Sequence, residues 1–286
     1  AAGTGVITLG DSDTAVSVTG DSTVGGTSTG QITFGAITIS DGKTLTVGAG
    51  ASTPISMTTV SGVANNSASN FTINTAGAVT VSGAIGTDIG TLTITNSGGA
   101  TFSGAVSAAS AVITSTTATN AVTFNGDLSL TTGLTVGAGS AAYNVAINGG
   151  TNSIAGTTTF NNTGTLALGN GGDTLAFTGG ITATAPSAVT VNGTLTAAGT
   201  GVINLGTVAV AGNTTIGGTS TGQITLGATT LADGVTLILG TGRANAISLS
   251  SVSGTASGTT SDLTINTTGA VTVSGAIGTD IGTLTI

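Results

Sequence analysis

One short pattern recurs along this chain and restricts its fold more than any other feature. An apolar residue, a small polar residue, a second apolar residue and a turn pair follow one another in AVTVSG at 78–83, ATFSG at 100–104, AVTFNG at 121–126, AVTVNG at 188–193 and AVTVSG at 270–275. Alternation with period 2 that ends at a turn residue is typical of a short β-strand with one buried face. The recurrence therefore predicts many short strands of one kind.

The second apolar position of this pattern defines a series with a period of about 21 residues, within the range of solenoid repeats. Every member is apolar, and the residue beside it is mostly a small hydroxyl residue. We expect the apolar side chains to face inward as a structural core ladder and the hydroxyls to face outward. The predicted core ladder consists of Val18, Ile39, Val60, Val81, Phe102, Phe124, Ile147, Leu168, Val191, Val210, Leu231, Val252 and Val273.

Two residues after each member of this ladder stands glycine or, less often, aspartate or asparagine. These three residue types favour tight turns. We expect them to form a turn ladder at one corner, consisting of Gly20, Asp41, Gly62, Gly83, Gly104, Gly126, Gly149, Asn170, Gly193, Gly212, Asp233, Gly254 and Gly275.

A second apolar strand follows about half a repeat later, as in Leu45/Val47 and Leu92/Ile94. A unit of about 21 residues is too small to bury a core alone, so it must stack on its neighbours. The sequence therefore predicts an all-β fold, a parallel β-helix (β-solenoid) with rungs of about 21 residues. We expect residues 1–286 to form a single continuous solenoid segment.

A longer repeat encloses the short one. Residues 1–7 recur at 197–203, residues 25–33 recur at 217–225, and the stretch GAVTVSGAIGTDIGTLTI at 77–94 recurs unchanged at 269–286. The chain thus holds a long repeat, 1–196, and a partial second copy, 197–286. We expect it to be a piece of a longer repetitive protein.

Composition excludes several classes of function. Charged residues make up 4% of the chain and the net charge is −8, with Lys43 and Arg243 as the two basic residues. A chain with so few cations cannot neutralise phosphates, so we expect no nucleic-acid partner. No apolar run is long enough for a membrane-spanning helix. The mean hydropathy of +0.52 argues against disorder.

The residues for catalysis are sparse. Histidine, cysteine and glutamate are absent, and the ten aspartates are scattered along the chain. Asp41 and Asp233 occupy the turn ladder, and Asp88 and Asp280 lie in the repeated GTDIG, so we interpret them as turn-capping residues. Enzymes built on β-helices need clustered carboxylates with basic partners. We predict that the chain is not an enzyme and has no catalytic residues, with a carbohydrate-active β-helix as a lesser alternative.

Calcium is the one cofactor for which candidate ligands exist. Residues 168–176 partly match a calcium-binding nonapeptide that includes Asp173, and Asp11 and Asp13 have the spacing of a calcium-loop start. The nonapeptide occurs once, although such sites need tandem copies, and no further acidic ligand follows Asp13. We favour a plain turn and a solvated bulge, and expect no cofactor.

Outward threonines raise one more alternative, an ice-binding face. The outward pairs are Thr80/Ser82, Thr101/Ser103 and Thr123/Asn125, but also Ala146/Asn148. This array is interrupted and chemically mixed, so a solvated β-surface is the favoured interpretation.

The repeat style of GAVTVSGAIGTDIGTLTITNSGGATFSGAV, residues 77–106, resembles that of β-strand-repeat bacterial surface proteins. These are filamentous-haemagglutinin-like exoproteins and the passengers of autotransporters. The resemblance implies secretion, a right-handed parallel β-helix and an extracellular location on the bacterial cell surface. We expect a non-catalytic structural segment that self-associates into a filament, sheath or surface layer. The alternative is the stalk of an adhesin that attaches to a host or neighbouring cell surface.

Overall fold

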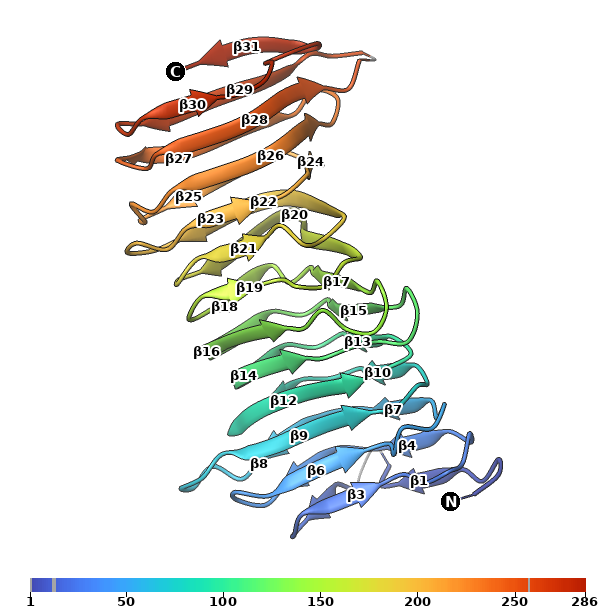
Figure 1. Ribbon diagram of the computed structural model, residues 1–286. Helices are drawn as coiled ribbons and strands as arrows, with labels where there is room; N and C mark the ends of the chain where they lie inside the picture. Colours follow the sequence, from blue (N-terminus) through green and yellow to red (C-terminus); the bar gives the residue numbers. More distant parts are fainter. Residues whose placement is uncertain (1, 12–13, 257) are drawn as a thin grey trace. The chain divides into compact units, whose positions relative to one another are not determined.

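The computed structural model describes residues 2–11, 14–256 and 258–286. Its strands stack in parallel as a β-solenoid of about 12 turns with about 23 residues per turn (Figure 1). The predicted fold class is confirmed, and the turn is slightly longer than predicted. The chain divides into two compact units, residues 1–149 (unit 1) and 150–286 (unit 2). The prediction of one continuous segment stays a prediction.

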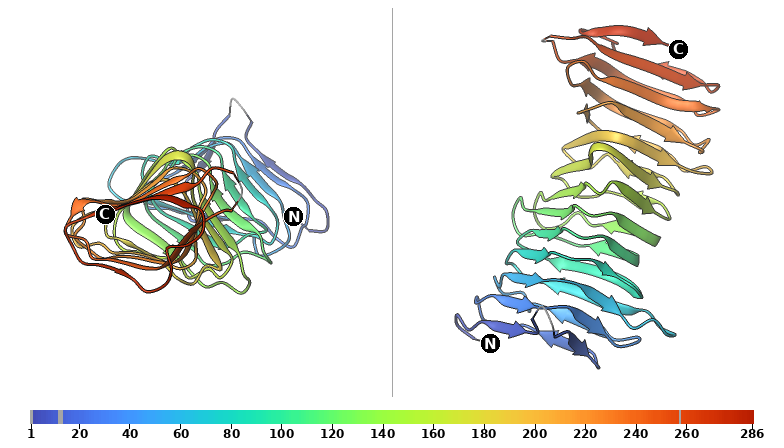
Figure 2. Two further views of the ribbon diagram at one scale, coloured as in Figure 1. Left: turned by 90° about the horizontal axis from the view of Figure 1, so that it is seen from above. Right: turned by 180° about the vertical axis from the view of Figure 1, so that it is seen from behind.

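In unit 1 each coil contributes a strand to each of three columns of parallel strands (Figure 2). The first column contains β1 (Ile7–Leu9), β4 (Ile32–Phe34), β7 (Ile55–Met57), β10 (Val79–Val81), β13 (Ala100–Phe102), β15 (Ala121–Phe124) and β17 (Asn144–Ile147). The second contains β2 (Val16–Val18), β5 (Ile37–Ile39), β8 (Val60–Gly62), β11 (Ile85–Gly86) and the first halves of β14 (Val106–Ile113) and β16 (Leu128–Val136). The third contains β3 (Ser22–Val24), β6 (Thr44–Val47), β9 (Ser69–Asn74), β12 (Ile89–Asn96) and the second halves of β14 and β16.

Unit 2 has the same three-column plan. One column contains β18 (Thr151–Ile154), the second halves of β20 (Thr165–Phe177) and β22 (Ala188–Ala197), β25 (Thr214–Gly218), β27 (Thr236–Arg243), β29 (Ser261–Thr267) and β31 (Ile281–Thr285). The next contains β19 (Thr158–Thr159), β21 (Ile181–Ala183), β23 (Ile203–Leu205), the first halves of β26 (Ile224–Leu231) and β28 (Ile247–Gly254), and β30 (Val271–Val273). The last contains the first halves of β20 and β22, β24 (Val208–Val210) and the second halves of β26 and β28.

Alternation along each strand builds the core. Apolar residues at every second position are buried and the hydroxyl residues between them face out, as with Thr33 between Ile32 and Phe34 in β4 and Thr72 between Phe71 and Ile73 in β9. In the third column of unit 1 an aliphatic side chain meets its counterpart from coil to coil, through Val47, Ile73, Ile94, Ile113 and Val136. Because successive coils are in register, each adds its own layer to the core.

The predicted core ladder is partly confirmed. Twelve of its thirteen members are buried, and Val273 is half-buried. Two runs stack as predicted: Val81, Phe102, Phe124 and Ile147 in unit 1, and Leu168, Val191, Val210 and Leu231 in unit 2. Val18 also pairs with Ile39. The rings of Phe102 and Phe124 stack with their centroids 5.0 Å apart.

The rest of the predicted ladder is wrong, because its members stack on other residues. The pairs that the structure forms instead are Ile39 with Gly62, Val60 with Ile37, Val81 with Met57, Val252 with Thr229, and Val273 with Leu249. The reason is coil length, because these coils are longer than the spacing on which the predicted series is built. The series therefore slips from one column onto another that carries the same pattern.

Candidate functional site

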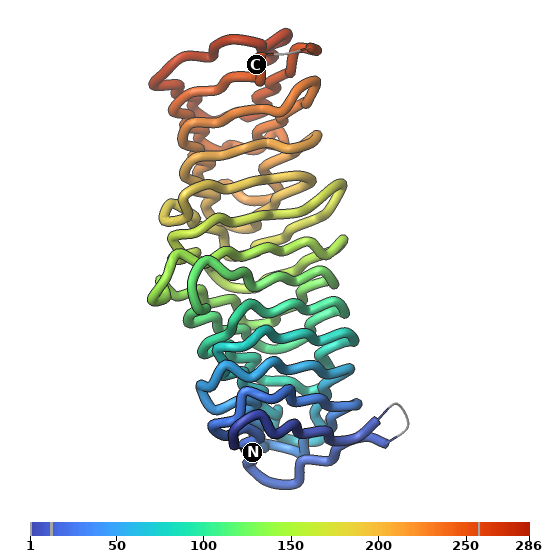
Figure 3. The backbone as a smooth tube through the Cα atoms, turned by 90° about the vertical axis from the view of Figure 1, so that its right-hand side faces the viewer, coloured from blue at the N-terminus to red at the C-terminus, as the bar shows by residue number. Residues whose placement is uncertain are grey.

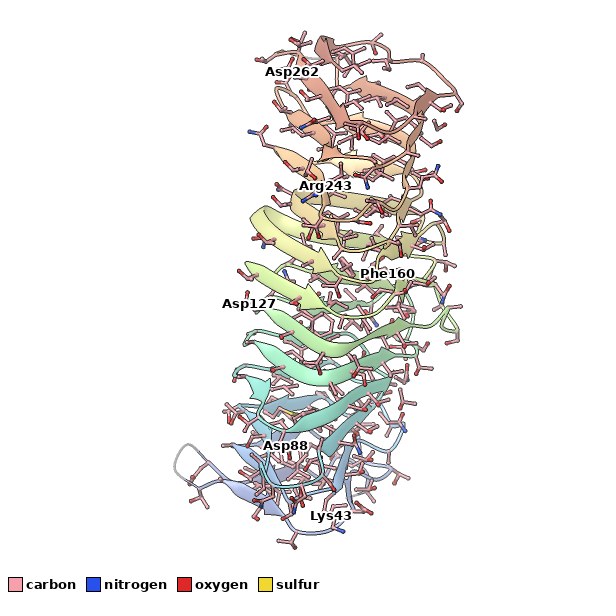
Figure 4. All side chains as sticks on the ribbon, turned by 90° about the vertical axis from the view of Figure 1, so that its left-hand side faces the viewer. Lys43, Asp88, Asp127, Phe160, Arg243 and Asp262 are labelled. Carbon is pink, nitrogen blue, oxygen red and sulfur yellow. The ribbon has the colours of Figure 1, made fainter. Side chains whose placement is uncertain are left out.

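The carboxylates of Asp21 and Asp41 accept hydrogen bonds from the backbone of a neighbouring coil. The Asp41 carboxylate accepts hydrogen bonds from the backbone N–H groups of Asn66, at 3.2 Å, and Ser67, at 2.8 Å, in the next coil. Asp21 likewise accepts from Thr44 N at 2.9 Å. In Figure 4 the labelled aspartates of unit 1, Asp88 and Asp127, lie on different coils. Within the described ranges, no three residues of the types Asp, Glu, His and Cys gather into a metal-binding group.

Asp88 and Asp280 form the same left-handed turn in the two copies of the repeat. Their backbone φ angles are 62° and 66°, a region that aspartate tolerates better than most residues. The Asp88 carbonyl accepts from Ser69 N at 2.9 Å, and that of Asp280 accepts from Ser261 N at 3.0 Å. The predicted turn role is therefore filled by the backbone of these residues, whereas Asp41 acts through its side chain.

Of the three calcium candidates, Asp13 lies outside the described residues, and Asp11 and Asp173 belong to different units. The Asp11 carboxylate accepts from Thr14 N at 2.7 Å, and the Asp173 carboxylate accepts from Asn170 N, also at 2.7 Å. Both contacts close a local turn of the kind that aspartate commonly forms.

Some members of the predicted turn ladder do lie at one corner, but glycine is required there for a reason other than turn conformation. Gly83, Gly104 and Gly126 follow one another at a corner where a Cβ atom would overlap the backbone of the coil before. Glycine is required there by the close approach of two backbones, since none of the three has a positive φ.

Other members of the predicted turn ladder belong to strands. Gly62 and Gly254 end β8 and β28, where both are buried and pair with core residues of the preceding coil. Asn170 lies at an irregularity within β20, between Leu168 and Asp173, and Gly193 lies inside β22 opposite Asp173. Gly62 and Gly254 were misassigned because the same apolar-polar-apolar-glycine pattern occurs in more than one column.

Sequence reasoning missed a set of buried polar residues at the corner that follows the third column of unit 1. We define this hydroxyl corner by Ser28, Thr53 and Thr75, all of which are buried. The Thr75 hydroxyl lies 2.8 Å from the carbonyl oxygen of Ala51 and 2.6 Å from that of Thr53, and accepts from Gly77 N at 3.0 Å. The corners of successive coils can be followed in Figure 3. Each hydroxyl therefore ties its own coil to the coil before.

The other two members of the hydroxyl corner bond in the same way. Ser28 donates to the Gly5 carbonyl at 2.6 Å and accepts from Gly30 N at 3.0 Å. Thr53 donates to the Ser28 carbonyl. Buried backbone carbonyls that face a neighbouring coil need such partners, because an unmet polar group in the interior is costly.

The second copy of the repeat rebuilds this corner in unit 2 with Ser220, Asn245 and Thr267. Ser220 donates to the Gly201 carbonyl at 2.6 Å, and the Thr267 hydroxyl lies 2.5 Å from the Asn245 carbonyl oxygen. Asn245 stands where the first copy has Thr53, and its amide donates to two carbonyls, at 2.9 and 2.7 Å. A hydroxyl followed two residues later by glycine marks the corner at Ser28, Thr75, Ser220 and Thr267, whereas isoleucine stands two residues after Thr53 and Asn245.

An outward column of hydroxyls runs along the first column of unit 1. Its members are in register from coil to coil: Thr8, Thr33, Ser56, Thr80, Thr101 and Thr123, followed by Ala146. This column of hydroxyls is more regular than the sequence predicts, because the observed register places Thr33 and Ser56 in line with its other members. The face is neutral and hydroxylated, which suits it to hydrogen bonding without charge.

Comparisons with protein-family models, with curated proteins and with solved structures find no match to this chain. None of the described residues belongs to a helix that is long and apolar enough to cross a membrane.

Proposed function

We propose that this chain is a non-catalytic structural segment of an extracellular, repetitive bacterial surface protein. Its role is to build a filament, sheath or surface layer by stacking of coils and by self-association. The observation that carries the proposal is the hydroxyl corner, which joins three successive coils of unit 1 each to the coil before through side-chain hydrogen bonds and is repeated in the second copy.

Such a corner favours mechanical strength within each unit. Three columns of parallel strands bond every coil to its neighbours, and the corner residues bond the segments between the columns. A protease needs several residues of unpaired backbone, and few are left where corners are also bonded. The coils therefore suit a stiff and protease-resistant material.

The surface chemistry supports self-association. Outward positions carry threonine, serine and asparagine, and charged residues make up 4% of the chain. Neutral hydroxylated faces of two copies approach without the repulsion that densely charged faces would create. The partner that we propose is therefore a further copy of the same repeat.

The proposal is tested by imaging the purified chain with cryo-electron microscopy over a range of concentrations. We expect fibres or layers with an axial spacing of about 4.8 Å, the distance between neighbouring strands. A parallel sample at high salt serves as the control, since the contacts that we propose are uncharged and should persist. Separate single particles at every concentration would overturn self-assembly and favour the adhesin stalk, in which one solenoid carries a distinct binding domain.

A further inference from the structure

The strand β20 of unit 2 contains an irregular bulge. We define the β20 bulge by residues 169–172, which read Gly-Asn-Gly-Gly and which the register between β20 and β22 skips between Leu168 and Asp173. The last three residues of the bulge are exposed, although Leu168 and Asp173 on either side of it are buried. The β20 bulge therefore lies outside the strand ladder to β22 and is open to solvent.

The β20 bulge contains a reactive pair, Asn170 followed by Gly171. An asparagine side chain can react with the backbone nitrogen of the next residue when that residue has no side chain to hinder the approach. A Cβ atom added at Gly171 or at Gly172 would meet no atom within 4 Å, so the backbone on this side of Asn170 has room to rotate. The Asp173 carboxylate accepts from Asn170 N at 2.7 Å and holds the other side of this residue.

We propose that Asn170 is a site of spontaneous deamidation, a covalent modification that the β20 bulge permits and the regular coils prevent. The backbone nitrogen of Gly171 attacks Cγ of Asn170 and forms the N–Cγ bond of a five-membered succinimide ring. The Cγ–Nδ2 bond breaks, and the leaving nitrogen departs as ammonia with the proton that the Gly171 nitrogen has lost. Water then opens the ring at one of its two carbonyl carbons and gives aspartate or isoaspartate.

The chain has three further Asn-Gly pairs, and one of them lies in a regular strand of the same unit. Asn192 and Gly193 lie inside β22, where Gly193 is buried and pairs with Asp173. Gly171, in contrast, is exposed. The Gly193 nitrogen can reach the side-chain carbon of Asn192 only after this part of the strand opens, which costs free energy and slows the reaction.

The two Asn-Gly pairs of unit 1 are held by hydrogen bonds. The backbone N–H groups of Asn125 and Gly126 both donate to the Phe102 carbonyl, at 2.8 and 3.4 Å. Asn148 N donates to the Phe124 carbonyl at 2.7 Å, and the side-chain amide of Asn148 donates to the side-chain oxygen of Asn125 at 3.2 Å. Ring formation at either pair would break these contacts, so both pairs should react more slowly than Asn170.

Deamidation changes the charge of the β20 bulge. Each event replaces a neutral amide by a carboxylate close to Asp173, in a chain whose net charge is −8. Isoaspartate also lengthens the main chain by one carbon atom, which the bulge can absorb because it lies outside the ladder. The modification therefore adds negative charge to this surface with time. The inference goes beyond the structural role proposed above and does not depend on it.

The test follows the folded 286-residue chain over time in slightly alkaline buffer made with heavy-oxygen water. The oxygen taken up on ring opening labels the product, and mass spectrometry of peptides locates it. We expect deamidation at Asn170 to be at least about tenfold faster than at Asn125, Asn148 or Asn192, since those sites must open first. A rate at Asn170 that is equal to or lower than the other three would overturn the proposal.

A parallel sample in denaturant separates the effect of the fold from that of the local sequence. We expect the four rates to lie within about threefold of one another there, because every site is then open. The same preference for Asn170 in denaturant would assign it to the neighbouring residues and contradict the role of the bulge.

A matched pair of variants tests the assignment by a second measurement, enzymatic methylation of isoaspartate. Asn170→Gln lengthens the side chain by one carbon atom, so the five-membered ring cannot form, and we expect the folded chain to lose most of its isoaspartate. Asn125→Gln makes the same change at an exposed asparagine of unit 1, and we expect isoaspartate formation within about threefold of the parent chain. Unchanged isoaspartate in Asn170→Gln would overturn the proposal.

Discussion

Replacing Thr75 by valine tests whether the hydroxyl corner holds adjacent coils together. Valine has nearly the shape of threonine, so Thr75→Val removes hydrogen bonds without opening a cavity. The lost partners are the carbonyls of Ala51 and Thr53 and the N–H of Gly77. The side chain is completely buried, so water cannot replace them easily.

The size of the effect follows from these contacts. A net intramolecular hydrogen bond contributes about 1 kcal/mol, and a buried group left unsatisfied costs about 1–3 kcal/mol. We therefore expect Thr75→Val to lower the free energy of unfolding around this corner by about 2–3 kcal/mol. Thr72→Val is the matched control, because Thr72 faces outward on β9, and we expect a change within about 0.5 kcal/mol.

Hydrogen exchange is the appropriate assay, since stability in a solenoid is local and unfolding need not be two-state. The Gly77 amide reports the corner directly because it donates to Thr75. A loss of about 2 kcal/mol speeds its exchange by about 30-fold. Thr267→Val, at the half-buried equivalent in the second copy, should have the same sign and a smaller effect. If Thr75→Val exchanges no faster than Thr72→Val, the hydroxyl corner does not stabilise the coils.

Three further predictions concern single sites. Phe102→Ala and Phe124→Ala should each destabilise unit 1 by about 3–5 kcal/mol in denaturant titrations. The double variant should reveal a coupling energy of about 1 kcal/mol between the stacked rings, and strict additivity of the two single effects would contradict the stack. Gly62→Ala should lower the free energy of unfolding by about 1–3 kcal/mol, because its Cβ would overlap the Asp88 carbonyl. Gly20→Ala, with open space around it, should be close to neutral in the same titrations, and equal effects of the two variants would refute the close approach. Burial raises the pKa of Tyr143 to about 12, so stability should be constant below pH 10 and fall between pH 10 and 12. The absorbance of this single tyrosine measures the titration, and a midpoint near 10 would contradict its burial.

The fold class was predictable from the sequence because alternation with period 2, combined with a short and regular apolar repeat, permits few other architectures. The exact coil was not predictable. Two columns carry the same apolar-hydroxyl-apolar pattern, so Val60 and Val81 look equivalent in sequence although they stack on Ile37 and Met57. The register is set by the lengths of the corners, which vary from coil to coil.

The hydroxyl corner was not predicted from the sequence for a related reason. Ser28 and Thr75 are two among many small hydroxyl residues, and their burial depends on which corner they occupy. Only the repetition of a hydroxyl two residues before glycine, as at Thr75-Ala76-Gly77 and Thr267-Thr268-Gly269, distinguishes these two residues. The role of Gly62 was misassigned because the turn residues were identified from the pattern and not from the register.

The register of the coils in unit 1 is tested most directly by pulsed electron paramagnetic resonance. Pairs of nitroxide labels are attached to cysteines introduced at Thr8 and Thr101, at Thr33 and Thr123, and at Thr8 and Thr123. The first two pairs span four coils and the last spans five, so the stacking predicts distances of about 19, 19 and 24 Å at about 4.8 Å per coil. Unequal distances for the first two pairs, or broad distributions for all three, would contradict the stacked solenoid.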